Sequence, residues 1–463
     1  MKIVEQEIND ILHSSKKYSE KDIKNIFTKA KKLKGLNVEE VSAILNIDDK
    51  NPLLKDLFQT AKEIKDTIYG NRLVLFAPLY VSNLCNNECL YCAFRASNKL
   101  IERKALSQQE IADQALALIK QGHKRILLVA GESYPKDGLQ YVFDSIKTIY
   151  AQKDGKNNIR RININIAPLT EDEFKELNKY NIGTFQLFQE TYHEPTYKKL
   201  HIAGPKSKYQ FRLDAIDRAF KAGMQDIGIG ILFGLYDYKY EIIAMFKHIE
   251  YLEKKYGIGP HTVSVPRIEP ATGSDLSENP PYPIDDLTFK KIIACLRIAV
   301  PYTGIILSTR ESEAMRRQAL ELGVSQISAG SKTNPGGYEE DEEEKHTGEQ
   351  FSLGDHRPLE KVIEDIVEHK HIPSFCTGCY RLGRVGKDFM DLAKPGLIKH
   401  HCLPNAIFSF AEYLLDYADD ILQKKGFDLI NQVIEKEMLD EKFQATIRKN
   451  IDEIKEGKRD VYL

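Results

Sequence analysis

Apolar residues follow a strand-like pattern in the middle of this chain. Between residues 73 and 328, short runs rich in isoleucine, leucine and valine recur, and more polar stretches separate them. Short apolar runs of this kind are typical of buried β-strands. We expect strands at residues 73–81, 125–129, 162–166, 184–188, 226–233, 262–265, 304–308 and 326–328.

The intervening stretches have a helical period. Their apolar residues recur three and four positions apart, which predicts helices at residues 107–121, 141–150, 171–179, 211–222, 241–255, 286–300 and 311–322. Strands that alternate with helices pair in parallel through helical crossovers. The eight repeats favour an α/β fold, a (β/α)8 barrel of the TIM type over residues 71–335. An open doubly wound sheet is the alternative, but no Gly-x-Gly-x-x-Gly follows the first strand.

Helical segments flank the predicted barrel. Residues 1–70 contain amphipathic patterns at 22–33 and 38–45, so we expect a helical N-terminal extension. Residues 336–358 are predicted to form a glycine-rich, acidic loop linker, in which we expect the acidic run 339–344 to be an exposed, mobile loop. Residues 359–463 are predicted to form a helical C-terminal domain, with helices at 359–368, 406–425 and 429–449 and a cysteine-bearing loop between them.

Composition excludes several classes of protein. The 463 residues carry 66 Lys and Arg against 68 Asp and Glu, a net charge of -2, which argues against a nucleic-acid partner. The charged N-terminus and the absence of a long apolar run argue against a signal peptide or a membrane span, so we expect a cytoplasmic protein. Seven cysteines in such a chain indicate metal ligands or catalytic groups rather than disulfides.

Three cysteines stand directly after the first predicted strand. Cys85, Cys89 and Cys92 have the spacing Cys-x3-Cys-x2-Cys. Three thiolates on a four-iron cluster leave one iron open to a substrate or cofactor. A structural zinc ion prefers a closed set of four ligands, and no nearby His or Cys completes one. The position also matters, because groups that act on substrates lie at the C-terminal ends of barrel strands.

A second set of cysteines lies in the C-terminal segment. Cys376, Cys379 and Cys402 have the spacing Cys-x2-Cys-x22-Cys, which indicates a second cluster. A zinc site completed by His400 or His401 is the alternative. Cys295 has no cysteine at a motif spacing and is expected to be a core thiol.

The first cysteine motif, with Tyr91 just before its third cysteine, resembles the signature of the radical S-adenosylmethionine (SAM) superfamily. The resemblance implies a [4Fe-4S] cluster whose open iron binds SAM, and one-electron cleavage of SAM to a 5′-deoxyadenosyl radical. It also implies further SAM contacts, at Gly131, Glu132, Glu190, Arg212, Gly228 and Gly230. Without the resemblance, Glu190 and Arg212 would be ion-pair residues, and Gly228 and Gly230 packing residues of a buried strand.

The whole chain, with its second cysteine set, resembles the HydG family of tyrosine lyases, which are [FeFe]-hydrogenase maturases. The resemblance implies cleavage of the Cα–Cβ bond of L-tyrosine to p-cresol and dehydroglycine. The second cluster, with a labile iron, would then form carbon monoxide and cyanide for an iron carbonyl cyanide precursor of the hydrogenase active site. The alternatives are a tyrosine lyase that supplies dehydroglycine (2-iminoacetate) for thiamine thiazole synthesis, a sulfur-insertion enzyme and an iron–sulfur scaffold.

The same resemblance assigns the remaining roles. His261 is the expected ligand of the labile iron, with a satisfied core histidine as the other interpretation; the rival histidines for this role are His193, His201, His400 and His401. Arg310 is expected to bind the tyrosine carboxylate, with Ser308 and Thr309 beside it; the alternatives are Arg267 in that role, or an ion pair of Arg310 with Glu311. The implied partners are tyrosine, free cysteine as an iron ligand, a flavodoxin- or ferredoxin-type electron donor and other hydrogenase maturases, with neither nucleic acid nor membrane.

Overall fold

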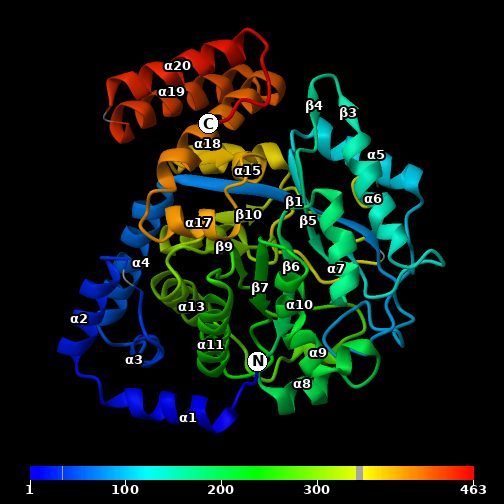
Figure 1. Ribbon diagram of the computed structural model, residues 1–463, viewed down its shortest axis with the longest axis vertical. Helices are drawn as coiled ribbons and strands as arrows, with labels where there is room; N and C mark the ends of the chain where they lie inside the picture. The colour runs from blue at the N-terminus through cyan, green and yellow to red at the C-terminus, as the bar shows by residue number, and fades with distance from the viewer. Residues whose placement is uncertain (34, 340–347, 439) are drawn as a thin grey trace.

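A closed parallel barrel forms the centre of the computed structural model, which describes residues 1–33, 35–339, 348–438 and 440–463 (Figure 1). Its strands, in ring order, are β1 (Arg72–Ser82), β2 (Arg125–Ala130), β5 (Arg161–Asn165), β6 (Phe185–Glu190), β7 (Ile227–Ile231), β8 (Thr262–Ser264), β9 (Gly304–Leu307) and β10 (Gln326–Ser328). The ring closes where β10 pairs with β1, Val74 opposite Gln326. The predicted (β/α)8 barrel is therefore confirmed, and the open sheet is wrong.

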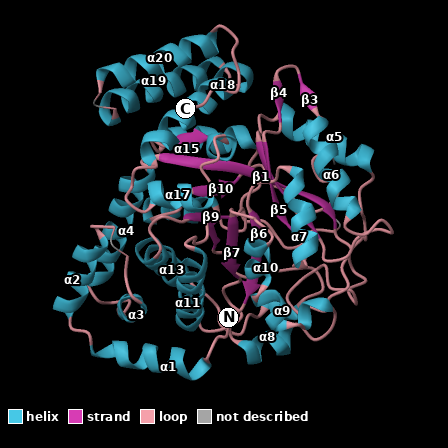
Figure 2. Cartoon of the chain, in the orientation of Figure 1, coloured by secondary structure: helices cyan, strands magenta, loops and turns pink. Residues whose placement is uncertain are grey.

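Helices cover the outside of the strands (Figure 2). They are α5 (Gln108–Lys120), α6 (Gln140–Ala151), α7 (Glu171–Leu177), α8 (Glu194–Leu200), α9 (Tyr209–Leu213), α10 (Ala215–Lys221), α11 (Tyr238–Tyr256), α12 (Asp275–Glu278), α13 (Asp286–Ala299) and α14 (Glu313–Leu322). Capping boxes fix several starts; at α5, Ser107 accepts from the Glu110 amide while the Glu110 carboxylate accepts from the Ser107 amide. The single helix predicted at 211–222 is two helices that meet at Asp214.

Inward and outward residues alternate along β1. Leu73, Leu75 and Leu79 are at most 1% exposed and belong to the main hydrophobic core under the helices. The residues between them face the barrel interior, and those from Arg72 to Tyr80 line two cavities described below. The period-2 geometry of a strand therefore divides β1 between core and cavity.

The N-terminal extension is helical, as expected. It comprises α1 (Glu5–Ser14), α2 (Glu20–Ala30), α3 (Val38–Leu45) and α4 (Leu53–Tyr69). Helix α4 packs along α13 and α14, and α1 and α3 pack on α11, so the extension covers one flank of the barrel (Figure 1). A small hairpin, β3 (Lys153–Asp154) and β4 (Asn157–Asn158), projects from the opposite flank. In the described residues no helix is long and apolar enough to cross a membrane.

The C-terminal segment is also helical and is joined to the barrel. Its elements are α15 (Leu359–Glu368), β11 (Ile372–Ser374), α16 (Gly378–Arg381), α17 (Gly386–Ala393), α18 (Lys399–Tyr417), α19 (Asp420–Glu437) and α20 (Glu441–Lys455). Strand β11 pairs in parallel with the start of β1, outside the ring. Where we expected two long helices, at residues 406–425 and 429–449, the structure has three, α18, α19 and α20. Asp419 and Asp440 cap the starts of α19 and α20. Residues 340–347 of the predicted linker, which include most of its acidic run, lie outside the described residues; of the described part, Phe351 lines a cavity of the barrel and Asp355 is buried, so this part of the linker is not an exposed loop.

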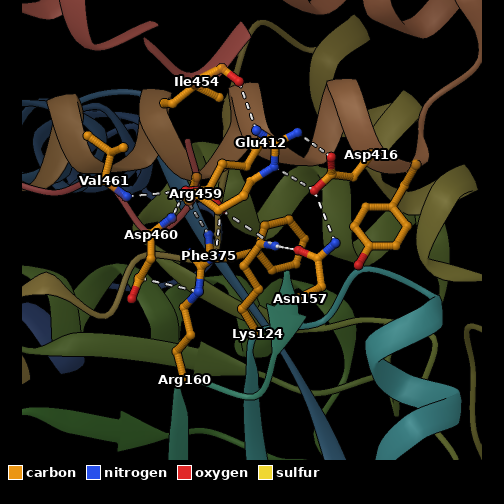
Figure 3. A network of polar contacts seen from close by, with 12 residues as sticks. Lys124, Asn157, Arg160, Phe375, Glu412, Asp416, Ile454, Arg459, Asp460 and Val461 are labelled. Carbon is orange, nitrogen blue, oxygen red and sulfur yellow. Dashed lines mark hydrogen bonds and ion pairs between the residues drawn. The ribbon is translucent and has the colours of Figure 1, made fainter. Parts of the chain in front are cut away.

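A buried ion network fixes α18 to the barrel (Figure 3). Glu412 of α18 accepts a hydrogen bond from Arg160 at 2.6 Å, and its other oxygen accepts from the Asp460 backbone amide at 2.7 Å. Lys124 lies 3.6 Å from the same carboxylate. The contacts join the strand starts, α18 and the last residues of the chain in one cluster.

Two candidate cluster sites at opposite ends of the barrel

The first cavity opens at the C-terminal ends of the barrel strands and has a volume of about 190 Å³. It brings together most of the predicted site residues. The members from that set are Cys85, Cys89, Cys92, Tyr91, Gly131, Glu132, Glu190, Arg212, Ser308, Thr309 and Arg310. Residues from the ends of four strands, β1, β2, β6 and β9, or from the segments after them thus meet where a barrel places its active site.

The cysteine loop after β1 is held in place by backbone hydrogen bonds. The Leu90 amide donates to Leu200 O and the Ile202 amide to Glu88 O, each at 3.0 Å. Burial raises the pKa of Cys92 to about 11, and the neighbouring Cys85 adds to the shift. Buried thiols of this kind ionise when a metal supplies the compensating charge. The three thiols therefore fit the iron–sulfur cluster expected here.

Tyr91 fixes the same loop. The His201 Nδ1 donates to Tyr197 O at 2.8 Å, so its Nε2 is free to accept from the Tyr91 hydroxyl at 2.8 Å. Burial, with Lys206 nearby, holds the pKa of His201 well below its usual value. His201 is therefore a neutral structural partner of the cysteine loop.

Four charged residues form a network beside the cysteines. Arg212 Nη1 donates to Glu132 at 2.8 Å, and Lys206 Nζ donates to Glu190 at 2.6 Å. Asn87, from within the cysteine motif, donates to the other Glu132 oxygen at 2.9 Å. Burial raises the pKa of both carboxyls, but the two cations outweigh it and hold each pKa below its usual range. Both carboxylates are thus ionised acceptors at the cavity wall.

Glu190 has a strained backbone. Its φ is +70°, in the left-handed region that residues other than glycine rarely adopt, and the register between β6 and β7 shifts at this point. The next turn is held by buried Glu241, which accepts from the Tyr192 amide at 2.7 Å and from the Thr191 hydroxyl. Strain held by such contacts is common at ligand sites.

The three predicted glycines differ in place. Gly131 lines the first cavity, and a Cβ there would lie 2.2 Å from the Leu84 carbonyl oxygen, so only glycine fits. Gly228 and Gly230 do not line it. A Cβ on Gly228 would lie only 2.4 Å from Thr262 Oγ1. Gly228 is therefore needed for close packing inside the barrel.

Arg310 faces the first cavity. Its guanidinium carbon lies 3.3 Å from the centroid of the Phe351 ring, and within the described residues it has no ion pair. Glu311 instead pairs with Arg267, whose Nε donates to it at 3.0 Å. Burial lowers the pKa of Arg310, against the opposing effects of Tyr80 and Glu269. The expected alternative, a pair of Arg310 with Glu311, is therefore not the geometry found.

The second cavity, of about 40 Å³, lies at the N-terminal ends of the strands. It gathers the second cysteine set and His261. Its lining residues are Arg72, Val74, Arg125, His261, Gln326, Ser374, Cys376, Thr377, Gly378, Cys379, Tyr380, Phe389 and Cys402. The cysteine expected in a loop, Cys402, lies in the first turn of α18, because that helix starts at Lys399 despite Pro404.

The second thiols lie close to one another. The Gly378 amide donates to the Cys376 sulfur at 3.3 Å, and a hydrogen bond from Cys379 lowers the pKa of Cys402. Among the described residues, no three His, Cys, Asp or Glu side chains are close enough to hold one bare metal ion. The donor set, three thiols that line one small cavity, fits an iron–sulfur core.

His261 is oriented as a metal ligand would be. Its Nδ1 lies 2.8 Å from Asp226 Oδ2 and donates to it, and its ring stacks on Phe389 at 4.1 Å. A carboxylate on one ring nitrogen leaves the other with a free lone pair. His400 and His401, the rivals, do not line the cavity; His401 accepts from Arg384 at 3.3 Å.

Sequence reasoning missed four polar residues of these sites. Asn87 and Lys206 belong to the charge network of the first cavity, and Arg72 and Arg125 line the second. The position of Asn87 inside the cysteine motif is the one local signal. The other three are lysine or arginine residues that belong to no motif in the sequence, and only the fold places them at the cavities.

A parallel (β/α)8 barrel with a three-cysteine loop after its first strand defines a radical SAM enzyme, a class that uses a [4Fe-4S] cluster and SAM. The Radical SAM superfamily model matches residues 79–249, and the Biotin and Thiamin Synthesis associated domain matches 264–371. A crystal structure of HydG, a maturase of the [FeFe]-hydrogenase, is 45% identical with a TM-score of 0.95, covering 99% of each chain. The chain belongs to the HydG family.

The chain is also similar to two further proteins. The X-ray structure of HydG from Carboxydothermus hydrogenoformans is 42% identical with a TM-score of 0.83, covering 97% of this chain and all of that one. The 2-iminoacetate synthase of Escherichia coli K12 is 35% identical over 310 residues, 67% of this chain and 79% of that protein.

Proposed function

We propose that this protein cleaves the Cα–Cβ bond of L-tyrosine to p-cresol and dehydroglycine and then forms carbon monoxide and cyanide at a second cluster. The product is an iron carbonyl cyanide precursor for the [FeFe]-hydrogenase active site. One observation carries the proposal: two separate thiol sets open into cavities at opposite ends of one barrel. The relatives of the HydG family support it.

The first cavity supplies the lyase site. Cys85, Cys89 and Cys92 hold the [4Fe-4S] cluster, which with SAM supplies the hydrogen-abstracting radical. Gly131 lets the chain pass close to the cofactor, and the carboxylates of Glu132 and Glu190 accept hydrogen bonds from it. Arg212 orients both carboxylates. Buried walls exclude water from the reacting groups.

Tyrosine binds on the other wall of this cavity. The Arg310 guanidinium, which has no carboxylate partner among the described residues, is free to fork onto the substrate carboxylate. Ser308 and Thr309 stand beside it. Arg267 is already paired with Glu311 and with Asp286, so it is the weaker candidate.

The second cavity supplies the later steps. Cys376, Cys379 and Cys402 hold the auxiliary cluster, and His261 binds its labile iron through Nε2, with free cysteine as a further ligand. A flavodoxin- or ferredoxin-type protein donates electrons, other hydrogenase maturases receive the product, and the reactions take place in the cytoplasm. The second thiol set favours this function over a tyrosine lyase for thiamine synthesis, which needs only the first.

An anaerobic assay tests the proposal. Reconstituted protein is given SAM, dithionite and tyrosine, and deoxyadenosine, p-cresol and carbon monoxide are measured. The Cys376→Ser/Cys379→Ser variant should form p-cresol without carbon monoxide, and Cys295→Ala, which removes a core thiol, should match the parent. Deoxyadenosine without p-cresol from the parent would contradict the lyase and favour sulfur insertion; p-cresol without carbon monoxide from the parent would favour the thiamine lyase.

A further inference from the structure

Two buried arginines at the second cavity have no role in the function proposed above. Arg72 opens β1 and Arg125 opens β2, and both line the cavity beside the second thiol set. Each side chain is 7% exposed. Two buried arginine side chains therefore line a cavity that is also lined by His261.

Neither guanidinium is satisfied by the protein. The Arg72 side chain makes no hydrogen bond or ion pair with any described residue; its guanidinium carbon lies 4.8 Å from the centroid of the Tyr69 ring, and its Nε has no partner. Arg125 donates from Nη1 to the Cys376 carbonyl oxygen at 3.1 Å, but its Nε also has no partner. Buried cations are normally paired, so an anion is expected to complete the site.

The thiols alone do not complete it. The Arg72 guanidinium keeps its positive charge, because an arginine side chain does not lose its proton in a protein. A sulfur atom is a weak acceptor, and a guanidinium has five N–H donors in one plane. Planar oxygen anions satisfy such a fork with two parallel hydrogen bonds. The ligand must also be small, because the auxiliary cluster proposed for Cys376, Cys379 and Cys402 takes up part of the same cavity.

We propose that Arg72 and Arg125 form a binding site for a small carboxylate, the two-carbon dehydroglycine fragment, next to the second thiol set. The assignment of that ligand rests on the proposed function. The guanidinium groups hold the carboxylate end, so the imine end points toward the thiols and His261. The site sits at the strand starts, where the inward face of β1 leads from the first cavity through Phe76 and Val74 to Arg72.

Glyoxylate, which carries the same carboxylate and replaces the imine nitrogen by oxygen, is the probe. Isothermal titration calorimetry is done on the cluster-loaded protein without SAM or tyrosine. The parent should bind one glyoxylate per chain, and Arg72→Gln and Arg125→Gln should each weaken binding ten- to a hundred-fold. The matched control is Arg161→Gln: Arg161 opens β5 and is also buried, but it donates to Asn181 and Ile182 and does not line the cavity.

A second set of measurements separates ligand binding from support of the cluster. Iron and sulfide contents and the EPR spectrum of the reduced cluster are recorded for every variant. Lost glyoxylate affinity with an unchanged cluster supports the site. Glyoxylate affinity equal to that of the parent overturns the proposal. This holds also if the EPR spectrum changes, because the arginines would then only balance the negative charge of the cluster. If Arg72→Gln loses iron, the Arg72→Lys variant is used instead, because lysine keeps the positive charge but lacks the planar guanidinium. Its glyoxylate affinity then decides in the same way.

Turnover gives an independent check. With tyrosine and SAM, Arg72→Gln should form p-cresol at the parent rate, form less carbon monoxide and release glyoxylate by hydrolysis of the fragment. If the parent itself forms no p-cresol, the proposed function fails, while the glyoxylate titration still decides whether the site exists.

Discussion

Replacing Glu412 by alanine should weaken the attachment of α18 to the N-terminal ends of the barrel strands and so lower the free energy of unfolding. The Glu412 side chain is 0% exposed and faces two cations that are themselves buried, Arg160 at 4% and Lys124 at 1% (Figure 3). Removing one partner of a buried ion pair costs about 3–5 kcal/mol, because the remaining charge is uncompensated. The Asp460 amide loses its acceptor as well. We expect a loss of about 4 kcal/mol in unfolding free energy at pH 7.

The loss should shrink as the pH rises. Burial and Arg160 already lower the pKa of Lys124 to about 8, against the opposing effects of Glu412 and Asp416. The folded pKa of this lysine lies below its unfolded pKa, so between the two values the unfolded chain binds more protons than the folded chain. The free energy of unfolding therefore rises with pH over that range. Without Glu412 the folded pKa of Lys124 falls further, so the free energy of unfolding of the variant starts to rise at a lower pH than that of the parent. The difference between the two proteins therefore becomes smaller at high pH.

Urea unfolding at pH 7 and pH 9, with hydrogen exchange of α18, measures both effects. Glu412→Gln, which keeps one acceptor, should lose less than alanine. Glu435→Ala, at an exposed ion pair of α19, should change stability by less than about 1 kcal/mol. The reasoning is refuted if Glu412→Ala unfolds within 1 kcal/mol of the parent and α18 keeps its protection.

Three further changes test the first cavity and its support. Arg310→Ala should raise the KM for tyrosine ten- to a hundred-fold, since a charge-assisted pair is worth about 1.5–3 kcal/mol, and should leave SAM affinity as in the parent; normal tyrosine binding would contradict its role. Lys206→Met removes the 2.6 Å partner of Glu190, so the SAM Kd, followed by the EPR change of the cluster, should rise about tenfold; an unchanged Kd would mean that the network does not position Glu190. Burial raises the pKa of Glu241 to about 7, so its stabilising contribution is present below pH 4 and lost as pH rises through 7; Glu241→Gln should therefore gain stability relative to the parent between pH 5 and pH 8, and a difference independent of pH would contradict the shift.

The barrel could be predicted because buried parallel strands are continuous apolar runs, which do not depend on distant contacts. Strands 125–129 and 326–328 were placed within one residue of their observed ends. Strand β11 could not be predicted, because it has only three residues, one of which is Pro373, and it forms only by pairing with β1. An edge strand tolerates that proline, whose missing N–H is not needed.

The sites divide in the same way. Cysteines at fixed spacing carry their chemistry in the sequence, so all six proposed ligands lie at the two cavities. Arg72, Arg125 and Lys206 could not be found, because a single cation in a sequence is usually a surface residue. Their burial comes from strand starts and a loop that meet only in the closed barrel.

Val74 should control passage between the two sites. It lines the second cavity, while the next inward residue of β1, Phe76, lines the first. A residue rises about 3.3 Å along a strand, so Arg72 and Tyr80 are about 26 Å apart, and a fragment made at one end must travel within the barrel to reach the other. Val74→Phe should leave p-cresol formation intact, reduce carbon monoxide and release glyoxylate, whereas Val74→Ala should resemble the parent. Equal carbon monoxide from both variants would show that the fragment does not pass along this wall.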